Sequence, residues 1–382
     1  MSIQRVIMQP TSFCNLDCSY CYVPDRLVKG SMTTDTLAHF FRVLFSSDVS
    51  EECRIVWHSG EPLVAGTAFY RQMFAIQRRY NQGGRRIAHG IQTNGTLINE
   101  DWCALFKEFD ISIGISLDGP AFMHDRHRVD RSGRGSFHQV IRAINLLRQW
   151  EIPHNVLSVL TRDSLEYPEE YFDFLVENNI ACSGFNIEET NVQTKRSSMV
   201  TKEEPSRRDL TSRYKHFVAT LFELWKQHYR TIEIRELSQM YHIVNEKSKN
   251  PAFRRTSQEQ FGMEVLNIKK NGDVSTFSPE LIEGNDGDRD AFVLGNVSQL
   301  TSFEELLATP KYKTIDAEVQ AGIEKCQKRC VYFDFCGGGH LSAKYFEHGT
   351  FDCTETEFCK LHRQALVDVV IDNLSLPKAY DR

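Results

Sequence analysis

The stretch CNLDCSYC, residues 14–21, places three cysteines close together, separated by three and then by two residues. A structural zinc site needs four ligands, usually as two closely spaced pairs, and the next His or Cys, His39, falls inside a predicted helix. A 4Fe–4S cubane has four iron corners, so three thiolates can hold it and leave one iron open. The spacing therefore favours an iron–sulfur cluster with one open coordination position, and zinc is the alternative.

The composition is that of a globular protein in a reducing compartment. The 382-residue chain has a net charge of −6, which argues against nucleic acid as a partner because phosphate binding requires a basic surface. No stretch reaches the roughly 18 consecutive apolar residues of a membrane helix. The first residues lack the layout of a signal peptide, so we expect a cytoplasmic protein with no membrane partner.

A second group of cysteines lies near the other end of the chain. Disulfides are not expected in the cytosol, so five cysteines at close spacing predict a second metal site. Four thiolates fit a closed zinc site as well as an iron–sulfur cluster. The five are Cys326, Cys330, Cys336, Cys353 and Cys359.

The first half of the chain alternates short apolar runs with stretches of helical periodicity. This alternation predicts parallel strands with right-handed crossovers, either a doubly wound sheet or a barrel, and six repeats favour a partial barrel. Asn271-Gly272 predicts a later hairpin. We expect strands over 5–9, 54–58, 89–93, 111–117, 155–160 and 183–187, and helices over 34–45, 139–150 and 169–178.

Polar motifs follow four consecutive predicted strands. CNLDCSYC follows the first strand, HSGEPL (58–63) the second, QTNGT (92–96) the third and SLDGP (116–120) the fourth. Taken alone, the last two are ordinary turns. Because the carboxyl ends of parallel strands meet at one rim, where barrels build active sites, the four together predict a site.

CxxxCxxC after a first strand resembles the hallmark of radical S-adenosylmethionine (SAM) enzymes. The resemblance implies an α/β fold with a partial (β/α)6 barrel and a 4Fe–4S cluster held by Cys14, Cys18 and Cys21. SAM chelates the open iron in that family, and an electron from the cluster cleaves SAM to a 5′-deoxyadenosyl radical that takes hydrogen from the substrate. A reductant such as flavodoxin or ferredoxin is also implied.

The strand-end loops then acquire expected roles toward SAM. HSGEPL is similar to the Gly-Gly-Glu-Pro loop of the family, whose backbone carbonyls and glutamate meet the SAM amino group. In the branch that resembles sulfatase maturases, the next two loops contact SAM and its ribose, and an arginine near the basic loop 124–137 pairs with the SAM carboxylate in related enzymes. The implied cofactor-binding residues are Ser59, Gly60, Glu61, Asn94, Ser116, Asp118 and Arg128.

The C-terminal cysteines resemble the SPASM extension, which carries auxiliary iron–sulfur clusters in peptide-modifying radical SAM enzymes. The family expects further cysteines where this chain has Phe277 and His340. In the family, those two cysteines are ligands of one auxiliary cluster. Because this chain lacks them, the resemblance implies a single auxiliary 4Fe–4S cluster, with Cys359 slightly favoured over Cys353 as its fourth ligand. The implied division is a barrel over 1–189, a helical connecting segment over 190–260 and a SPASM-like domain over 261–382.

STFSPEL (275–281), CGGG (336–339) and FNIEE (185–189), with the opening QPTSFCNLDCSYCY, resemble the maturases that form three-residue cyclophanes in ribosomally made precursor peptides, of the Xye and glycine-rich-repeat types. These join an aromatic ring to the β-carbon of a residue two positions on. The resemblance implies Glu280 as the catalytic base, with a surface turn as the alternative.

Four other functions remain open at this stage. Sulfatase maturases, which form formylglycine, carry an acidic residue where this chain has Ser278, so they are the second candidate. Other SPASM-type peptide modifications, thioether formation and epimerisation, are also compatible with the cysteine pattern. An electron carrier without catalysis and a zinc-stabilised interaction module are the two alternatives from other classes.

Overall fold

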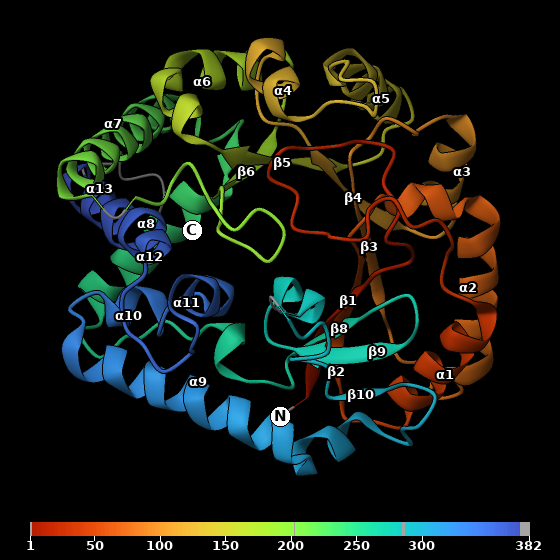
Figure 1. Cartoon of the computed structure of the whole chain (residues 1–382). Helices are drawn as coiled ribbons and strands as arrows, with labels where there is room; N and C mark the ends of the chain where they lie inside the picture. The colour runs from red at the N-terminus through yellow and green to blue at the C-terminus, as the bar shows by residue number, and fades with distance from the viewer. Residues whose placement is uncertain (1, 202, 285–286, 375–382) are drawn as a thin grey trace. The chain divides into compact units, whose positions relative to one another are not determined.

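Parallel β-strands followed by helices make up most of the chain (Figure 1). The structure is a computed structural model, and it describes residues 2–201, 203–284 and 287–374. It divides into two compact units. The first unit contains residues 1–116, 128–154 and 258–320, and the second contains residues 117–127, 155–257 and 321–382. The predicted domains, 1–189, 190–260 and 261–382, are a different kind of division from these compact units and stay a prediction.

A mixed β-sheet forms the centre of the first unit, with its strands in the order β10-β9-β8-β1-β2-β3-β4. Strands β1 to β4 and β8 run parallel, whereas β9 and β10 are antiparallel to their neighbours. The strands are β1 (Ile3–Met8), β2 (Val49–Trp57), β3 (Ala88–Thr93), β4 (Ile111–Ser116), β8 (Val265–Ile268), β9 (Asp273–Thr276) and β10 (Gly295–Asn296). The helices are α1 (Thr34–Phe45), α2 (Thr67–Tyr80), α3 (Glu100–Glu108) and α5 (Phe137–Gln149).

Local sequence explains most of these elements. Thr33 caps α1 by accepting a hydrogen bond from the Thr36 N–H, as expected of a threonine at a helix N-cap. The predicted helix over 34–45 is confirmed. Strand β2 begins at Val49, five residues before the predicted start, because exposed Glu51 and Glu52 interrupt the apolar pattern from which strands are recognised.

The predicted hairpin is confirmed as β8 and β9. The Gly272 N–H donates to the Lys269 carbonyl at 2.9 Å, and Gly272 has a φ of +90°, which favours glycine. The hairpin extends the parallel strands of the first unit beyond β1 and places the segment after β9 in the same unit as the three N-terminal cysteines.

The second unit contains the parallel strands β5 to β7 and most of the remaining helices. Its strands are β5 (His154–Leu160), β6 (Cys182–Ile187) and β7 (Glu233–Ile234). Its helices include α4 (Ala121–His127), α6 (Pro168–Glu177), α7 (Glu204–His228), α8 (Arg235–Lys249), α10 (Phe333–Cys336), α11 (Leu341–His348), α12 (Glu357–Cys359) and α13 (Leu366–Asp372), and α9 (Pro310–Arg329) has residues in both units.

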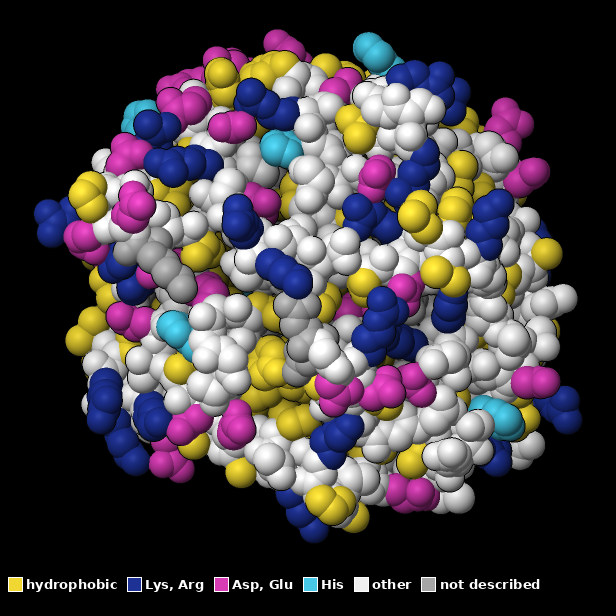
Figure 2. Space-filling model, in the orientation of Figure 1, with side chains coloured by type: hydrophobic (Ala, Val, Ile, Leu, Met, Phe, Trp, Pro, Cys, Tyr) yellow, Lys and Arg dark blue, Asp and Glu magenta, His cyan; other side chains and the backbone are white. Residues whose placement is uncertain are grey.

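Surface features agree with the composition. Figure 2 shows basic and acidic side chains interspersed over the face in view. Among the described residues, no helix is both long enough and apolar enough to cross a membrane.

Candidate active site

Three thiols lie on the loop that follows β1. Cys14, Cys18 and Cys21 are half-buried, and none is in a disulfide. The loop is held by backbone hydrogen bonds at both ends of the motif: the Cys14 N–H donates to the Arg26 carbonyl at 3.0 Å, and the Cys21 N–H donates to the Cys18 carbonyl at 3.3 Å. These two hydrogen bonds hold the backbone of the loop in a defined conformation.

Arg131 fastens this loop from the segment before α5. Its Nη2 donates to the carbonyls of Cys14 (2.9 Å) and Arg26 (3.0 Å), and its Nη1 pairs with Asp17 at 3.1 Å. Arg26 pairs with the same carboxylate at 2.8 Å. The sequence singled out the basic loop 124–137 but did not distinguish Arg131 from its neighbours, because its partners lie more than 100 positions away.

The environment of Cys14 fits a thiolate bound to a positive iron centre. Its Sγ accepts hydrogen bonds from the Leu16 N–H (3.4 Å) and the Asn94 side-chain amide (3.7 Å). Burial, and to a smaller extent Glu61, raise the pKa of Cys14 to about 12. A thiolate here therefore needs a compensating cation, which a cluster iron would provide.

Gly60 packs the HSGEPL loop directly against the backbone that leads into Cys14. It has a φ of +62°, and a Cβ at this position would lie 2.4 Å from the Thr11 carbonyl oxygen and 2.8 Å from that of Phe13. Only glycine fits such an approach. Ser59, beside it, also has a positive φ of 71°. The loop after β2 and the loop after β1 thus form one surface.

Glu61 connects this surface to β3. Its Oε1 accepts from the Leu63 N–H (2.9 Å) and the Thr93 hydroxyl (2.6 Å), and its Oε2 accepts from the Asn94 N–H (2.8 Å). The side chain is buried, which raises its pKa to about 7 although the three hydrogen bonds act in the other direction. Both carboxylate oxygens therefore have partners within the protein, and the predicted contact with SAM stays a prediction.

Replacing Glu61 with glutamine is expected to lower the free energy of unfolding by about 1–3 kcal/mol, because one amide N–H would face a backbone donor and leave it unsatisfied. Urea denaturation of the apo-protein measures the change. Glu108→Gln is the control, since its exposed ion pair with Arg71 contributes little and should leave the midpoint within error. Equal midpoints for the two variants would contradict the bracing role of Glu61.

Asn94 also contacts the cysteine loop. Its side-chain amide donates to the Asn15 side-chain oxygen at 2.9 Å, and its own oxygen accepts from the Thr96 N–H at 2.9 Å. Ser116, at the end of β4, accepts from the Gln92 amide at 3.0 Å. These contacts bring the loops after β1 and β3 together within the first unit.

The other two predicted SAM-binding residues, Arg128 and Asp118, belong to different units. Arg128 is buried in the first unit, with its guanidinium 5.4 Å from the centroid of the Tyr20 ring. Asp118 belongs to the second unit, where its carboxylate accepts from the Val159 N–H at 3.0 Å. Their predicted contacts with SAM stay predictions.

Glu280 lies in a short 3-10 helix, Pro279–Glu283, that follows β9. The Ser278 hydroxyl donates to its Oε2 at 2.5 Å. Burial raises the pKa of the Tyr22 phenol, and the nearby Glu280 carboxylate raises it further as the second cause. Tyr22 directly follows Cys21, and its hydroxyl is 2.7 Å from the Ser59 hydroxyl. Glu280 is therefore a half-buried carboxylate near the cysteine loop rather than an exposed turn residue.

The second cysteine group lies on helical segments of the second unit. Cys326 is on α9, Cys336 ends α10 and Cys359 ends α12. The Gly338 N–H donates to Cys336 Sγ at 3.4 Å, and the Gln364 amide donates to Cys359 Sγ at 3.8 Å. Such N–H donors suit thiolate ligands.

Cys359 lies near other thiols of this group, and its role as the fourth ligand stays a prediction. Burial, and after it the neighbouring Cys336, Cys330 and Cys326, raise the pKa of Cys359 to about 12. The pKa of Cys353 is raised by burial and then affected chiefly by lysine and carboxylate side chains.

No three His, Cys, Asp or Glu side chains of the described residues converge as a single metal ion requires. A cubane binds its thiolates through separate irons.

The positions where the family expects two further cysteines are occupied by well-packed side chains. Phe277 is 2% exposed. The His340 ring lies 4.6 Å from that of Phe358, and its Nδ1 is 2.7 Å from the Ser342 hydroxyl. Ser342 in turn donates to Glu189 at 3.0 Å. Neither position offers a thiol to a cluster.

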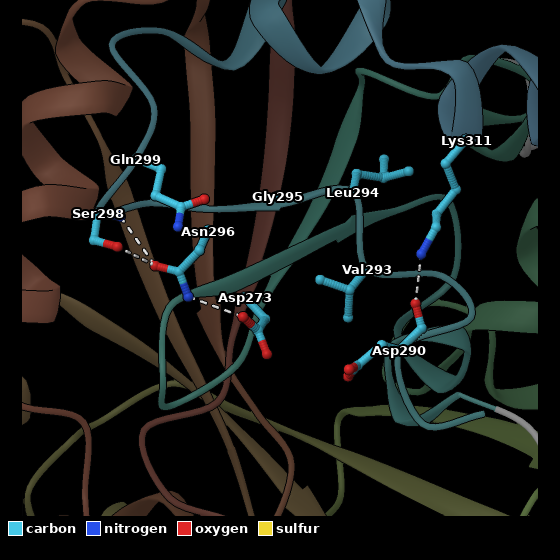
Figure 3. Close-up of a pocket in the computed structure, with 9 residues that line it drawn as sticks. All are labelled: Asp273, Asp290, Val293, Leu294, Gly295, Asn296, Ser298, Gln299 and Lys311. Carbon is cyan, nitrogen blue, oxygen red and sulfur yellow. Dashed lines mark hydrogen bonds between the residues drawn. The ribbon is translucent and has the colours of Figure 1, made fainter. Parts of the chain in front are cut away.

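A polar cavity of about 500 Å³ lies beside β9 and β10 (Figure 3). The Lys311 ammonium donates to the Asp290 carbonyl at 2.8 Å, and the Asn296 amide donates to Asp273 at 2.8 Å. The described residues that line it include none of the predicted site residues. The lining of this cavity therefore does not overlap with the predicted cofactor-binding, metal-binding and catalytic residues.

The similarity to known proteins includes the residues of this candidate site. A model of the radical SAM superfamily matches residues 8–175, which include the cysteine loop and the loops after β2 to β4. The uncharacterized protein sll1766 of Synechocystis is 38% identical over 97% of this chain and 91% of its own length. Over residues 8–175 the chain belongs to the radical SAM superfamily. It is therefore a radical SAM enzyme, which uses a 4Fe–4S cluster and SAM.

Two further comparisons concern maturases. A cysteine-type anaerobic sulfatase-maturating enzyme of Clostridium novyi is 27% identical over 92% of this chain and 91% of its own length. The structure of anSMEcpe with bound AdoMet and a Cp18Cys peptide superposes with a TM-score of 0.78 at 23% identity, over 97% of each chain. The predicted fold class is confirmed, and the radical SAM enzyme is of the maturase type.

Proposed function

We propose that this radical SAM enzyme crosslinks a ribosomally synthesised precursor peptide, joining an aromatic ring to the β-carbon of a residue two positions on. A peptide substrate is supported by anSMEcpe, whose structure contains a Cp18Cys peptide. The crosslink itself is supported by the segment after β9, which differs from that of the sulfatase maturases. We further propose that the protein works in the cytoplasm with flavodoxin or ferredoxin as reductant.

The proposed roles of the N-terminal residues follow from their contacts. Cys14, Cys18 and Cys21 would hold the cluster, which supplies the electron that cleaves SAM to the 5′-deoxyadenosyl radical. Arg131 keeps the carbonyls of that loop in place. Glu61 joins the loop after β2 to the end of β3. The protein thus contributes a rigid rim on which SAM would be oriented.

The observation that carries the proposal is the pair Ser278 and Glu280. Sulfatase maturases resemble this chain but carry a cysteine and an acidic residue where it has Phe277 and Ser278. Here the carboxylate comes two residues later and is oriented by the Ser278 hydroxyl at 2.5 Å. A shifted base suits a substrate whose acidic proton lies elsewhere, as the proton on a newly joined aromatic ring does.

Glu280 would accept that proton. Crosslinking removes two hydrogens from the peptide: one leaves the β-carbon as a hydrogen atom to the deoxyadenosyl radical, and the other leaves the ring as a proton. One electron must also leave the ring radical for aromaticity to return. A carboxylate at hydrogen-bonding distance of the ring carbon contributes to such a proton transfer by general base catalysis.

Mass spectrometry of a small peptide encoded beside this gene tests the proposal, after anaerobic incubation with iron-loaded enzyme, SAM and reductant. Loss of two hydrogens, with no fragment ions between an aromatic residue and the residue two positions on, is the expected result. Loss of two hydrogens from one serine, or an aldehyde that reacts with a hydrazine, would instead establish formylglycine formation. A crosslink through cysteine sulfur, or deuterium uptake at an α-carbon, would establish a thioether or an epimer.

Cys359→Ser is expected to lower the iron content by about four of about eight atoms per chain, because it removes the fourth ligand of the auxiliary cluster. Cys353→Ser should retain the full content. Iron analysis of anaerobically reconstituted protein, with zinc measured in the same samples, checks both variants. Iron loss in Cys353→Ser alone would reverse the assignment of the fourth ligand.

A further inference from the structure

Lys344 is a fully buried lysine in the second unit. It lies on α11, its exposure is 0%, and its Nζ has no hydrogen-bond partner among the described residues. A buried ammonium without a counter-charge costs several kcal/mol, so native proteins keep one only where something compensates for it. None of the described residues accepts a hydrogen bond from this ammonium. We therefore infer that a negative group bound at this place stabilises it.

Two glycines show where the ammonium ends. A Cβ on Gly339 would lie 3.1 Å from Lys344 Cε, and a Cβ on Gly322 would lie 3.1 Å from Lys344 Nζ. Gly322 precedes Cys326 by four residues on α9, so the two share one helix face. Gly339 follows Cys336 by three residues. The side chain therefore runs beside the glycine-rich step after Cys336 and ends against the face of α9 that carries Cys326.

The charge of Lys344 also reaches the thiols. Burial raises the pKa of Cys326 and of Cys353, and the Lys344 ammonium acts against this rise at both residues. Lys325 is the only other lysine named among the causes for Cys353, and it is half-exposed and paired with Asp352 at 2.7 Å. Lys344 is thus the buried and unpaired positive charge of this cysteine group.

We propose that Lys344 is the counter-charge of the auxiliary 4Fe–4S cluster and raises its reduction potential. The proposal rests on the auxiliary cluster assigned above to Cys326, Cys330, Cys336 and Cys359. Accepting one electron makes the cluster more negative by one charge, and a cation in a buried site stabilises the more negative state. Net charge is among the factors that set the potential of iron–sulfur clusters.

In the proposed reaction, a higher reduction potential would make the auxiliary cluster a better electron acceptor. When the crosslink forms, the ring radical loses one proton to a base and one electron to an oxidant, and the oxidised auxiliary cluster would be that oxidant. A higher potential favours this transfer. Lys344 would be a positioning residue for charge rather than a catalytic one, because it acts through the cluster.

The midpoint potential of the auxiliary cluster, measured by redox titration with EPR detection, tests the proposal without any peptide. The full chain carries Cys14→Ala, Cys18→Ala and Cys21→Ala, so that one cluster is observed. Adding Lys344→Met should lower the one-electron reduction equilibrium constant at least tenfold, a shift of about 59 mV. Iron and zinc analysis precedes the titration, and zinc in place of iron would overturn the proposal.

Two further variants separate charge from packing. Lys325→Met is the matched control, since a half-exposed charge that is paired with Asp352 is screened and should shift the potential far less. Lys344→Arg retains the charge and should retain the potential. If Lys344→Met cannot hold the cluster, retention in Lys344→Arg supports the counter-charge, and loss in both overturns it. An unchanged potential in a fully loaded Lys344→Met protein also overturns it. None of these outcomes depends on the peptide experiment.

Discussion

Replacing Cys18 with alanine is expected to abolish both deoxyadenosine formation and peptide modification. Cys18 is the middle thiol of the loop after β1, and its carbonyl accepts the Cys21 N–H, so the substitution removes a ligand while the backbone can keep its path. Two thiolates cannot hold three corners of a cubane. The protein should fold, lose about four iron atoms per chain and leave SAM intact. Chromatography of the anaerobic reaction mixture quantifies deoxyadenosine.

Cys103→Ala is the matched control for this variant. Cys103 is buried on α3, and burial raises the pKa of its thiol to about 11, so it behaves as a small core residue. Removing its sulfur should cost about 1 kcal/mol of stability and leave the iron content and the turnover unchanged. Deoxyadenosine formation by Cys18→Ala at the rate of Cys103→Ala would remove the three-thiolate site from the mechanism.

The cysteine spacing and the strand pattern were sufficient to predict the fold, because both are local properties. Three thiols within one short loop predict a metal or iron–sulfur site from their spacing alone. The predicted strands that end before the polar loops are set by short apolar runs, and the helix over 34–45 is set by its cap and its apolar face. Such features depend on neighbours within a few positions.

The contacts that hold the site could not be predicted in this way. Arg131 reaches the carbonyl of Cys14 across 117 positions, and the sequence gives it no mark that distinguishes it from other arginines of its loop. Glu61 accepts hydrogen bonds from three donors of the folded chain, and two of these, on Thr93 and Asn94, are more than 30 positions away. The sequence does not distinguish Lys344 from other helix residues, whereas the structure shows that it is buried and that its Nζ has no hydrogen-bond partner among the described residues. All three depend on tertiary proximity.

Replacing Glu280 with glutamine is expected to separate radical formation from product formation. Glutamine keeps the size of the side chain and can still accept a hydrogen bond from Ser278, but it cannot take up a proton. Loss of a general base costs about 10²- to 10⁴-fold in the step that it assists. Crosslinked peptide should therefore fall by about that factor, while deoxyadenosine continues to form because the cysteine loop is unchanged.

The ratio of deoxyadenosine to crosslinked peptide, measured in one reaction by mass spectrometry, distinguishes this result from simple damage. A misfolded variant loses both products, whereas loss of the base raises the ratio. Ser278→Ala should raise the ratio less, since it removes only the hydrogen bond that orients Glu280. Glu108→Gln, at an exposed ion pair, should leave it unchanged. An unchanged ratio in Glu280→Gln would assign the proton to another group, because no role for Glu280 as the base survives a glutamine that works equally well.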